Sequence, residues 1–76
     1  MDDLREYLNS LKPADQHRYA KRCGTTVGYL RKAVSVKQRI SEGLCIELER
    51  ESGGKVRCER LRDDVDWAYL RRRSVA

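Results

Sequence analysis

Long hydrophobic runs are missing from this chain of 76 residues. It contains no stretch of about 18 consecutive apolar residues, so we expect no segment that crosses a membrane. The first residues are acidic and contain no apolar signal core, so we also expect no secretory signal and a cytoplasmic protein. A chain of this length has room for one domain, residues 1–76, with a thin hydrophobic core.

Groups able to perform chemistry are equally scarce. The chain holds one histidine, His17, and three widely spaced cysteines without a CxxC pair, which are Cys23, Cys45 and Cys58. A zinc site usually needs four ligands in close pairs, so we expect reduced thiols, no metal and no cofactor, with Cys23 and Cys45 in the core. There are no paired carboxylates in an apolar setting and no glycine-rich phosphate loop, so an enzyme is not expected. Turnover abolished by changing His17 would contradict this expectation.

Acidic residues are sparse in the middle of the chain, where basic residues accumulate. Residues 12–39 contain eight lysines and arginines and a single acid, Asp15, whereas residues 40–66 contain five basic and eight acidic residues. The net charge of the whole chain is +5, so the positive charge is concentrated in one segment. Phosphate binding needs such a concentration, because each neutralised phosphate releases condensed counterions. The alternative is an ordinary solvated face.

Apolar residues recur at helical spacing through most of the chain, which predicts an all-α fold, a compact bundle of about five short helices. The predicted helices cover residues 2–11, 13–23, 26–34 and 42–52. Pro13 suits the first turn of the second helix, and Ser41 can cap the fourth. Gly53 and Gly54 can end that fourth helix. Residues 55–72 could form one or two short helical turns or irregular structure, and a short strand is the less favoured alternative.

Two of these helices, joined by a tight turn at Gly24, have the pattern of a helix-turn-helix over residues 16–34. Glycine can adopt the positive φ angle that reverses the chain after a helix. Ala20 is small where the two helices must approach closely, and Thr25 or Thr26 can cap the second helix. We expect the inward side chains to be Tyr19, Ala20, Cys23, Leu30, Ala33 and Val34. In such a motif the second helix lies in the major groove of DNA, and here the motif coincides with the basic segment.

The outer side of that second helix, residues 26–34, supplies the predicted base-reading residues, which are Thr26, Val27, Gly28, Arg31 and Lys32. Arg31 and Lys32 can donate hydrogen bonds to O6 and N7 of guanine, although both could also be solvated surface residues. Thr26 can hydrogen-bond a base or a phosphate. Val27 could contact a thymine methyl group, and Gly28 would allow a close backbone approach. The connector that follows is suited to grip the DNA backbone through Ser35, Lys37, Gln38 and Arg39.

Residues 66–76 form a predicted C-terminal tail that contains the single tryptophan of the chain. Trp67 either closes the hydrophobic core or, with Tyr69 and Leu70, supplies a patch for a dimer contact. The pattern of residues leaves both roles open. The arginines at positions 71–73 could contact phosphate.

Residues 16–34 resemble the helix-turn-helix of the phage Cro and C1-type repressors. That family has a glutamine, an alanine, a glycine and a leucine at the positions of Gln16, Ala20, Gly24 and Leu30. The runs CGTTVGYLRKAVS and IELERESGGKVRCERLRDDVDW also resemble the YdaS-like Cro/antitoxin regulators of prophages. The resemblance implies a lambda-repressor-like bundle that binds a roughly palindromic DNA operator as a homodimer. It also implies that Gln16 contacts the DNA backbone.

Together these observations predict a sequence-specific DNA-binding transcriptional regulator, a phage-type repressor that blocks polymerase by occupying its operator. The expected partners are double-stranded DNA and a second copy of the chain. The alternative is an antitoxin-like interaction module that neutralises a partner toxin through the acidic fourth helix or the patch around Trp67. Sequence-independent RNA binding is less favoured, because Tyr29 is the only aromatic residue expected to face outward from the basic segment.

Overall fold

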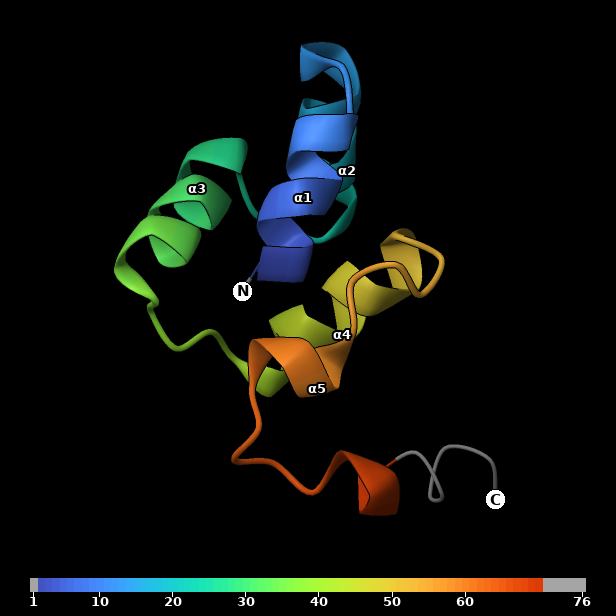
Figure 1. Cartoon of the computed structure of the whole chain (residues 1–76). Coiled ribbons are helices and arrows are strands. Elements are labelled where there is room, and N and C mark those ends of the chain that lie inside the picture. The colour runs from blue at the N-terminus through green and yellow to red at the C-terminus, as the bar shows by residue number, and fades with distance from the viewer. Residues whose placement is uncertain (1, 71–76) are drawn as a thin grey trace.

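Five α-helices follow one another in the computed structural model, which describes residues 2–70 (Figure 1). They are α1 (Asp2–Ser10), α2 (Pro13–Arg22), α3 (Val27–Val36), α4 (Glu42–Glu51) and α5 (Cys58–Leu61), and residues 67–70 form a further helical turn. No strand occurs between residues 2 and 70, which confirms the predicted all-α class. The Cα radius of gyration is 12.1 Å, close to the ~11 Å of a compact chain of this length. Residue 1 and residues 71–76, among them the three arginines of the tail, lie outside the described part.

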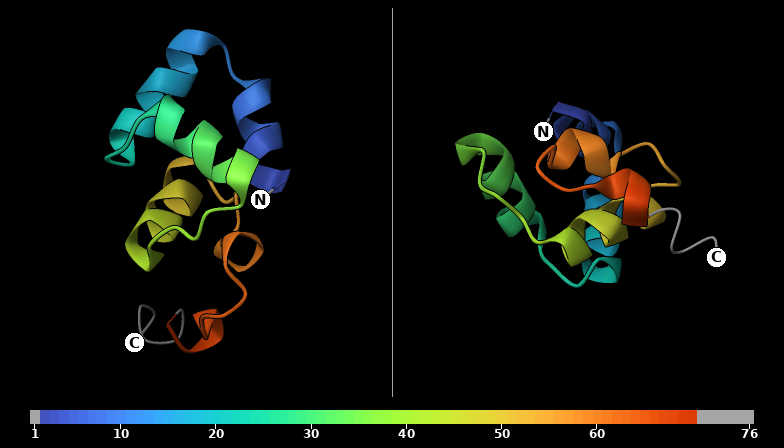
Figure 2. Two further views of the ribbon diagram at one scale, coloured as in Figure 1. Left: turned by 90° about the vertical axis from the view of Figure 1, so that its left-hand side faces the viewer. Right: turned by 90° about the horizontal axis from the view of Figure 1, so that it is seen from below.

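The first two helices form a V-shaped hairpin, and α3 lies across its open side (Figure 2). Lys12 has the extended backbone expected of a residue before proline, and Pro13 is the first residue of α2. The side-chain amide of Gln16 donates hydrogen bonds to the carbonyl oxygens of Leu8, at 2.8 Å, and Leu11, at 3.0 Å. The last carbonyl groups of a helix have no N–H partner within the helix, and these bonds supply partners to carbonyl groups at and just after the end of α1.

The turn between α2 and α3 has the predicted features. Gly24 adopts a φ angle of +78°, in the left-handed region that favours glycine. The Thr26 hydroxyl accepts a hydrogen bond from the backbone N–H of Tyr29 at 3.1 Å, so Thr26 rather than Thr25 caps α3. The helix runs from Val27 to Val36, two residues beyond the predicted end at residue 34. The helix ends before Lys37, which adopts a left-handed conformation with a φ angle of 53°. Glycine is the usual residue at such a position, so the sequence does not indicate this helix end.

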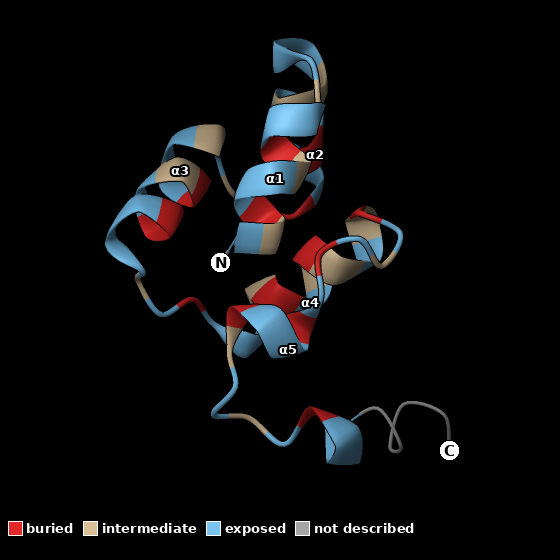
Figure 3. Cartoon of the chain, in the orientation of Figure 1, coloured by how far each residue is buried: buried red, intermediate tan, exposed pale blue. Residues whose placement is uncertain are grey.

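The hydrophobic core lies where α3 and α4 meet the hairpin (Figure 3). All six inward side chains predicted for the helix-turn-helix are buried, and the buried Tyr19 hydroxyl donates a hydrogen bond to the carbonyl oxygen of Leu48 at 2.7 Å. Three further buried residues were not expected in the core, namely Ile40, Val56 and Cys58. Ile40 and Val56 lie in connectors and Cys58 begins a helix of four residues. None of them belongs to a periodic apolar pattern long enough to predict burial.

The fourth helix and the C-terminal segment complete the core. Ser41 caps α4 by accepting a hydrogen bond from the N–H of Leu44 at 3.2 Å, as predicted. Trp67 is 5% exposed, and its indole N–H donates to the carbonyl oxygen of Arg62 at 2.6 Å. Of the two roles considered for this residue, closing the core is the one observed. Tyr69 and Leu70 are 52% and 37% exposed.

Candidate nucleic-acid interface

Helix α3 occupies one side of the molecule with its outer face uncovered. In the left view of Figure 2 no other element passes in front of it, while α1 and α2 lie behind it. Its inner side chains Leu30, Ala33 and Val34 are buried, and its outer side is exposed. The helix-turn-helix therefore presents its second helix in the way that insertion into a groove requires.

The exposed stripe of α3 differs in part from the predicted base-reading set. It consists of Gly28, Tyr29, Lys32, Ser35 and Val36. Gly28 and Lys32 lie where the sequence placed them. Tyr29, 39% exposed, and Val36, 59% exposed, were not among the predicted contacts. The spacing of three to four residues on either side of Lys32 could have identified them, because residues so spaced share one face of a helix.

Three predicted base-reading residues lie at the border of this stripe. Val27 is half-buried and packs against the core, so its side chain does not face fully outward. Thr26 is exposed, but its hydroxyl oxygen is engaged in capping α3. Arg31 is half-buried and reaches back toward the hairpin. These positions follow from the rotation of the helix, which turns residues 27 and 31 toward α1 and α2.

Arg31 meets two side chains of the hairpin. Its guanidinium donates hydrogen bonds to the side-chain oxygens of Asn9 in α1, at 2.8 Å, and Gln16 in α2, at 3.4 Å. The structure thus brings together two predicted DNA-contacting residues, Gln16 and Arg31, and adds Asn9, which sequence reasoning missed. Asn9 and Arg31 are 22 positions apart in the sequence, which explains why no local pattern linked them.

Four predicted backbone-contacting residues lie at the end of α3 and in the connector after it. Ser35 belongs to the last turn of α3, whereas Lys37 and Arg39 lie in the connector, and all three are exposed, as that role requires. Gln38 is half-buried, and its amide donates to the Tyr29 hydroxyl at 3.4 Å. Ser35 is part of the exposed stripe and the other three residues follow it along the chain, so the structure places them beside the candidate base-reading face.

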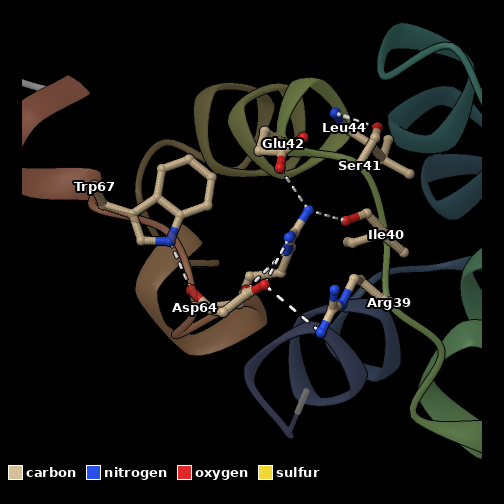
Figure 4. A network of polar contacts seen from close by, with 8 residues as sticks. Arg39, Ile40, Ser41, Glu42, Leu44, Asp64 and Trp67 are labelled. Carbon is tan, nitrogen blue, oxygen red and sulfur yellow. Dashed lines mark hydrogen bonds and ion pairs between the residues drawn. The ribbon is translucent and has the colours of Figure 1, made fainter.

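A network around Arg62 fixes this connector to the C-terminal segment (Figure 4). The Arg62 side chain is 11% exposed and donates to the carbonyl oxygen of Ile40 at 3.1 Å and to Glu42 at 2.9 Å. It also makes two hydrogen bonds to Asp64, at 3.0 and 2.8 Å. These bonds lower the pKa of Asp64 from an ordinary 3.8 to about 2. Asp64 in turn lies 3.7 Å from the guanidinium of Arg39.

The segment that contains α3 carries only basic charged residues over a long stretch of sequence. Between residues 16 and 41 the chain contains no aspartate or glutamate. Within residues 2–70, no acidic side chain pairs with Lys32 or Lys37. Ion pairs instead stabilise other elements, such as Arg50 with Glu47 in α4, at 2.7 Å. A polyanion would therefore meet Lys32 and Lys37 without an acidic partner on this face, whereas Arg39 is paired with Asp64.

Two of the three buried cysteines are weakly acidic. Burial raises the pKa of the Cys23 and Cys45 thiols from 9.0 to about 11, so both are protonated at neutral pH and poor metal ligands. No group of three or more metal-ligating side chains occurs in the described residues. Nor does any helix of residues 2–70 have the length and apolar character needed to cross a bilayer.

Comparison with known proteins adds one partial similarity. A segment of 28 residues, 37% of this chain, is 57% identical to an Escherichia coli (strain K12) protein named "Putative transcriptional regulator YdaS". Part of the chain resembles a transcriptional regulator. The match spans 29% of the length of that relative. No family model and no solved structure matches the chain.

Proposed function

We propose that this protein is a DNA-binding transcriptional regulator that inserts the outer face of α3 into the major groove of an operator. The observation that carries the proposal is the uncovered, acid-free face of the second helix of a helix-turn-helix. The partial similarity to a protein named as a transcriptional regulator supports it independently. The proposal needs no catalytic group and no cofactor.

The chemistry of the exposed stripe suits direct readout of bases. The Lys32 ammonium can donate to guanine O6 and N7, and Gly28 lets the backbone come close to the groove floor. Tyr29 and Val36 offer apolar surface for thymine methyl groups. Lys37 and Arg39 would bind phosphates on the flank, which fixes the position of the helix without reading sequence.

Dimerisation and repression belong to the same proposal. A helix of ten residues touches few base pairs, so two copies on a palindromic site would double the contacts. Their half-sites would lie roughly 34–36 Å apart, about one turn of DNA. Occupancy of such a site would block polymerase sterically. The antitoxin-like role considered from the sequence stays a prediction.

A binding-site selection from random duplexes, followed by affinity measurements on the selected site, tests the proposal. We expect a preferred sequence, and Lys32→Ala should weaken binding to it by about 1–3 kcal/mol with little effect on random DNA. Lys55→Ala is the matched control, because Lys55 is exposed in the turn that follows α4. That turn lies on the opposite side of the molecule from α3 (Figure 1). Selection of no sequence would refute the proposal, and equal losses on both duplexes would make Lys32 a backbone contact.

A further inference from the structure

Arg31 is held by two neutral side chains instead of by an acid. Asn9 and Gln16 accept its hydrogen bonds through amide oxygens, which carry no net charge. Two nearby arginines behave differently, since Arg18 pairs with Asp15 and Arg39 pairs with Asp64. The Arg31 guanidinium is therefore oriented by two hydrogen bonds, and no acidic side chain of residues 2–70 pairs with it to offset its positive charge.

One of the two acceptors that hold Arg31 is itself held by hydrogen bonds. The Gln16 amide nitrogen is bound to the carbonyl oxygens of Leu8 and Leu11, which turns its oxygen toward Arg31. Asn9 lies in the last turn of α1, directly before the bend of the hairpin. A chain of hydrogen bonds thus connects the end of α1 through Gln16 to Arg31. It uses two of the five guanidinium N–H groups and leaves the others for a ligand.

The direction of Arg31 distinguishes it from the base-reading stripe. Successive residues are about 100° apart around a helix, so Arg31 lies on the flank when Lys32 points into the groove. Its half-buried side chain reaches toward the V of α1 and α2 rather than along the exposed stripe. A group on the flank of a docked helix faces a sugar–phosphate ridge rather than the edges of the bases.

We propose that Arg31 binds a DNA backbone phosphate and that Asn9 and Gln16 are positioning residues that orient its guanidinium before binding. The inference rests on the proposed function and changes two assignments made from the sequence. Arg31 contacts phosphate instead of reading a base, and Gln16 acts through Arg31 instead of touching DNA. Holding the guanidinium in advance reduces the conformational freedom that binding must remove.

Asn9→Asp provides the central test, because the substitution retains an oxygen acceptor and adds a carboxylate beside Arg31. Pairing with that carboxylate should neutralise the guanidinium, lower affinity roughly tenfold on selected and random duplexes alike, and reduce the salt slope by about one unit. Ser10→Asp is the matched control. It adds the same charge to an exposed neighbour whose hydroxyl donates to the Tyr7 carbonyl oxygen rather than contacting Arg31, so it should have a smaller effect.

The Arg31→Ala background separates positioning from general electrostatics. In that background Asn9→Asp should weaken binding no more than Ser10→Asp does, and Asn9→Ala should add nothing. Circular dichroism would establish that each variant is folded. An Asn9→Asp variant that matches Ser10→Asp in the wild-type background would overturn the inference, as would an Arg31→Ala variant that changes base preference at one position. A wild-type protein that prefers no duplex sequence would instead refute the proposed function.

Discussion

Lys37 ends α3 in a left-handed conformation that is unfavourable for a residue with a side chain. It is the only non-glycine residue with positive φ among residues 2–70, and it also belongs to the predicted phosphate contacts. The backbone geometry and the charge of Lys37 can therefore be separated by substitution.

We predict that Lys37→Gly raises the free energy of unfolding by about 1 kcal/mol, because glycine adopts this conformation without a steric penalty. Lys37→Ala removes the same charge but retains the unfavourable geometry. Urea denaturation should therefore place the glycine variant above both wild type and the alanine variant. Both variants should lose the same amount of DNA affinity. A glycine variant no more stable than the alanine variant would show that the geometry carries no penalty.

Within the candidate site, the sequence predicted the orientation of some side chains of α3 but not of others. Lys32 and Gly28 were placed correctly, because their spacing from Leu30 puts them on the opposite side of one helix. Arg31 and Val27 were predicted to face outward and are half-buried instead, because their exposure depends on how α3 packs against α1 and α2. Residues at the border of an apolar stripe point inward or outward according to their tertiary neighbours.

At the scale of elements, α3 depends on the cap at its first turn. The sequence offers two adjacent threonines, and only the structure shows that Thr26 provides the oxygen. Thr26→Ala should lower the free energy of unfolding by about 1 kcal/mol, because the N–H of Tyr29 then loses its partner. Thr25→Ala removes the same hydroxyl from the neighbouring residue and should have a smaller effect. Thermal or urea unfolding of the pair checks this, and equal losses would contradict the assignment of the cap.

Element boundaries were predictable wherever a residue imposes them. Pro13, Ser41 and the glycine pair after α4 each have a stereochemical reason to start or stop a helix, and the helices obey them. The end of α3 was placed two residues early, because a lysine terminates it. The short α5 helix was expected only loosely, since four residues are too few for a periodic pattern.

At the scale of the whole molecule, the Arg62 network joins segments far apart in sequence. Arg62 contacts Ile40, 22 positions away, and Glu42, 20 positions away. Such long-range polar contacts leave no mark in local sequence, so neither they nor the burial of Ile40 was foreseen. The distribution of charge along the chain, by contrast, needs no contacts to be known, because it is counted directly from the sequence.

The same network predicts an acid transition. Asp64 has a pKa of about 2 in the folded protein and near 3.8 when unfolded, so it stabilises the fold above the higher value. This stabilisation should be lost as the pH falls from about 4 to about 2, because the unfolded chain takes up the proton first. The urea concentration at the midpoint of unfolding should therefore decrease over this pH range, and Asp64→Asn should make that decrease smaller. Asp63→Asn, a change at the exposed neighbouring acid, should leave the fall intact, and an identical response of both variants would rule out Asp64 as its source.

The three buried cysteines give this molecule built-in reporters of local opening. Cys23 follows α2, Cys45 lies within α4 and Cys58 begins α5, so each thiol samples a different part of the core. A disulfide-exchange reagent can reach a thiol only when the part that covers it opens. The rates at which the three sulfurs are modified would therefore rank the elements by how often they open, and would do so on the natural sequence without any introduced label.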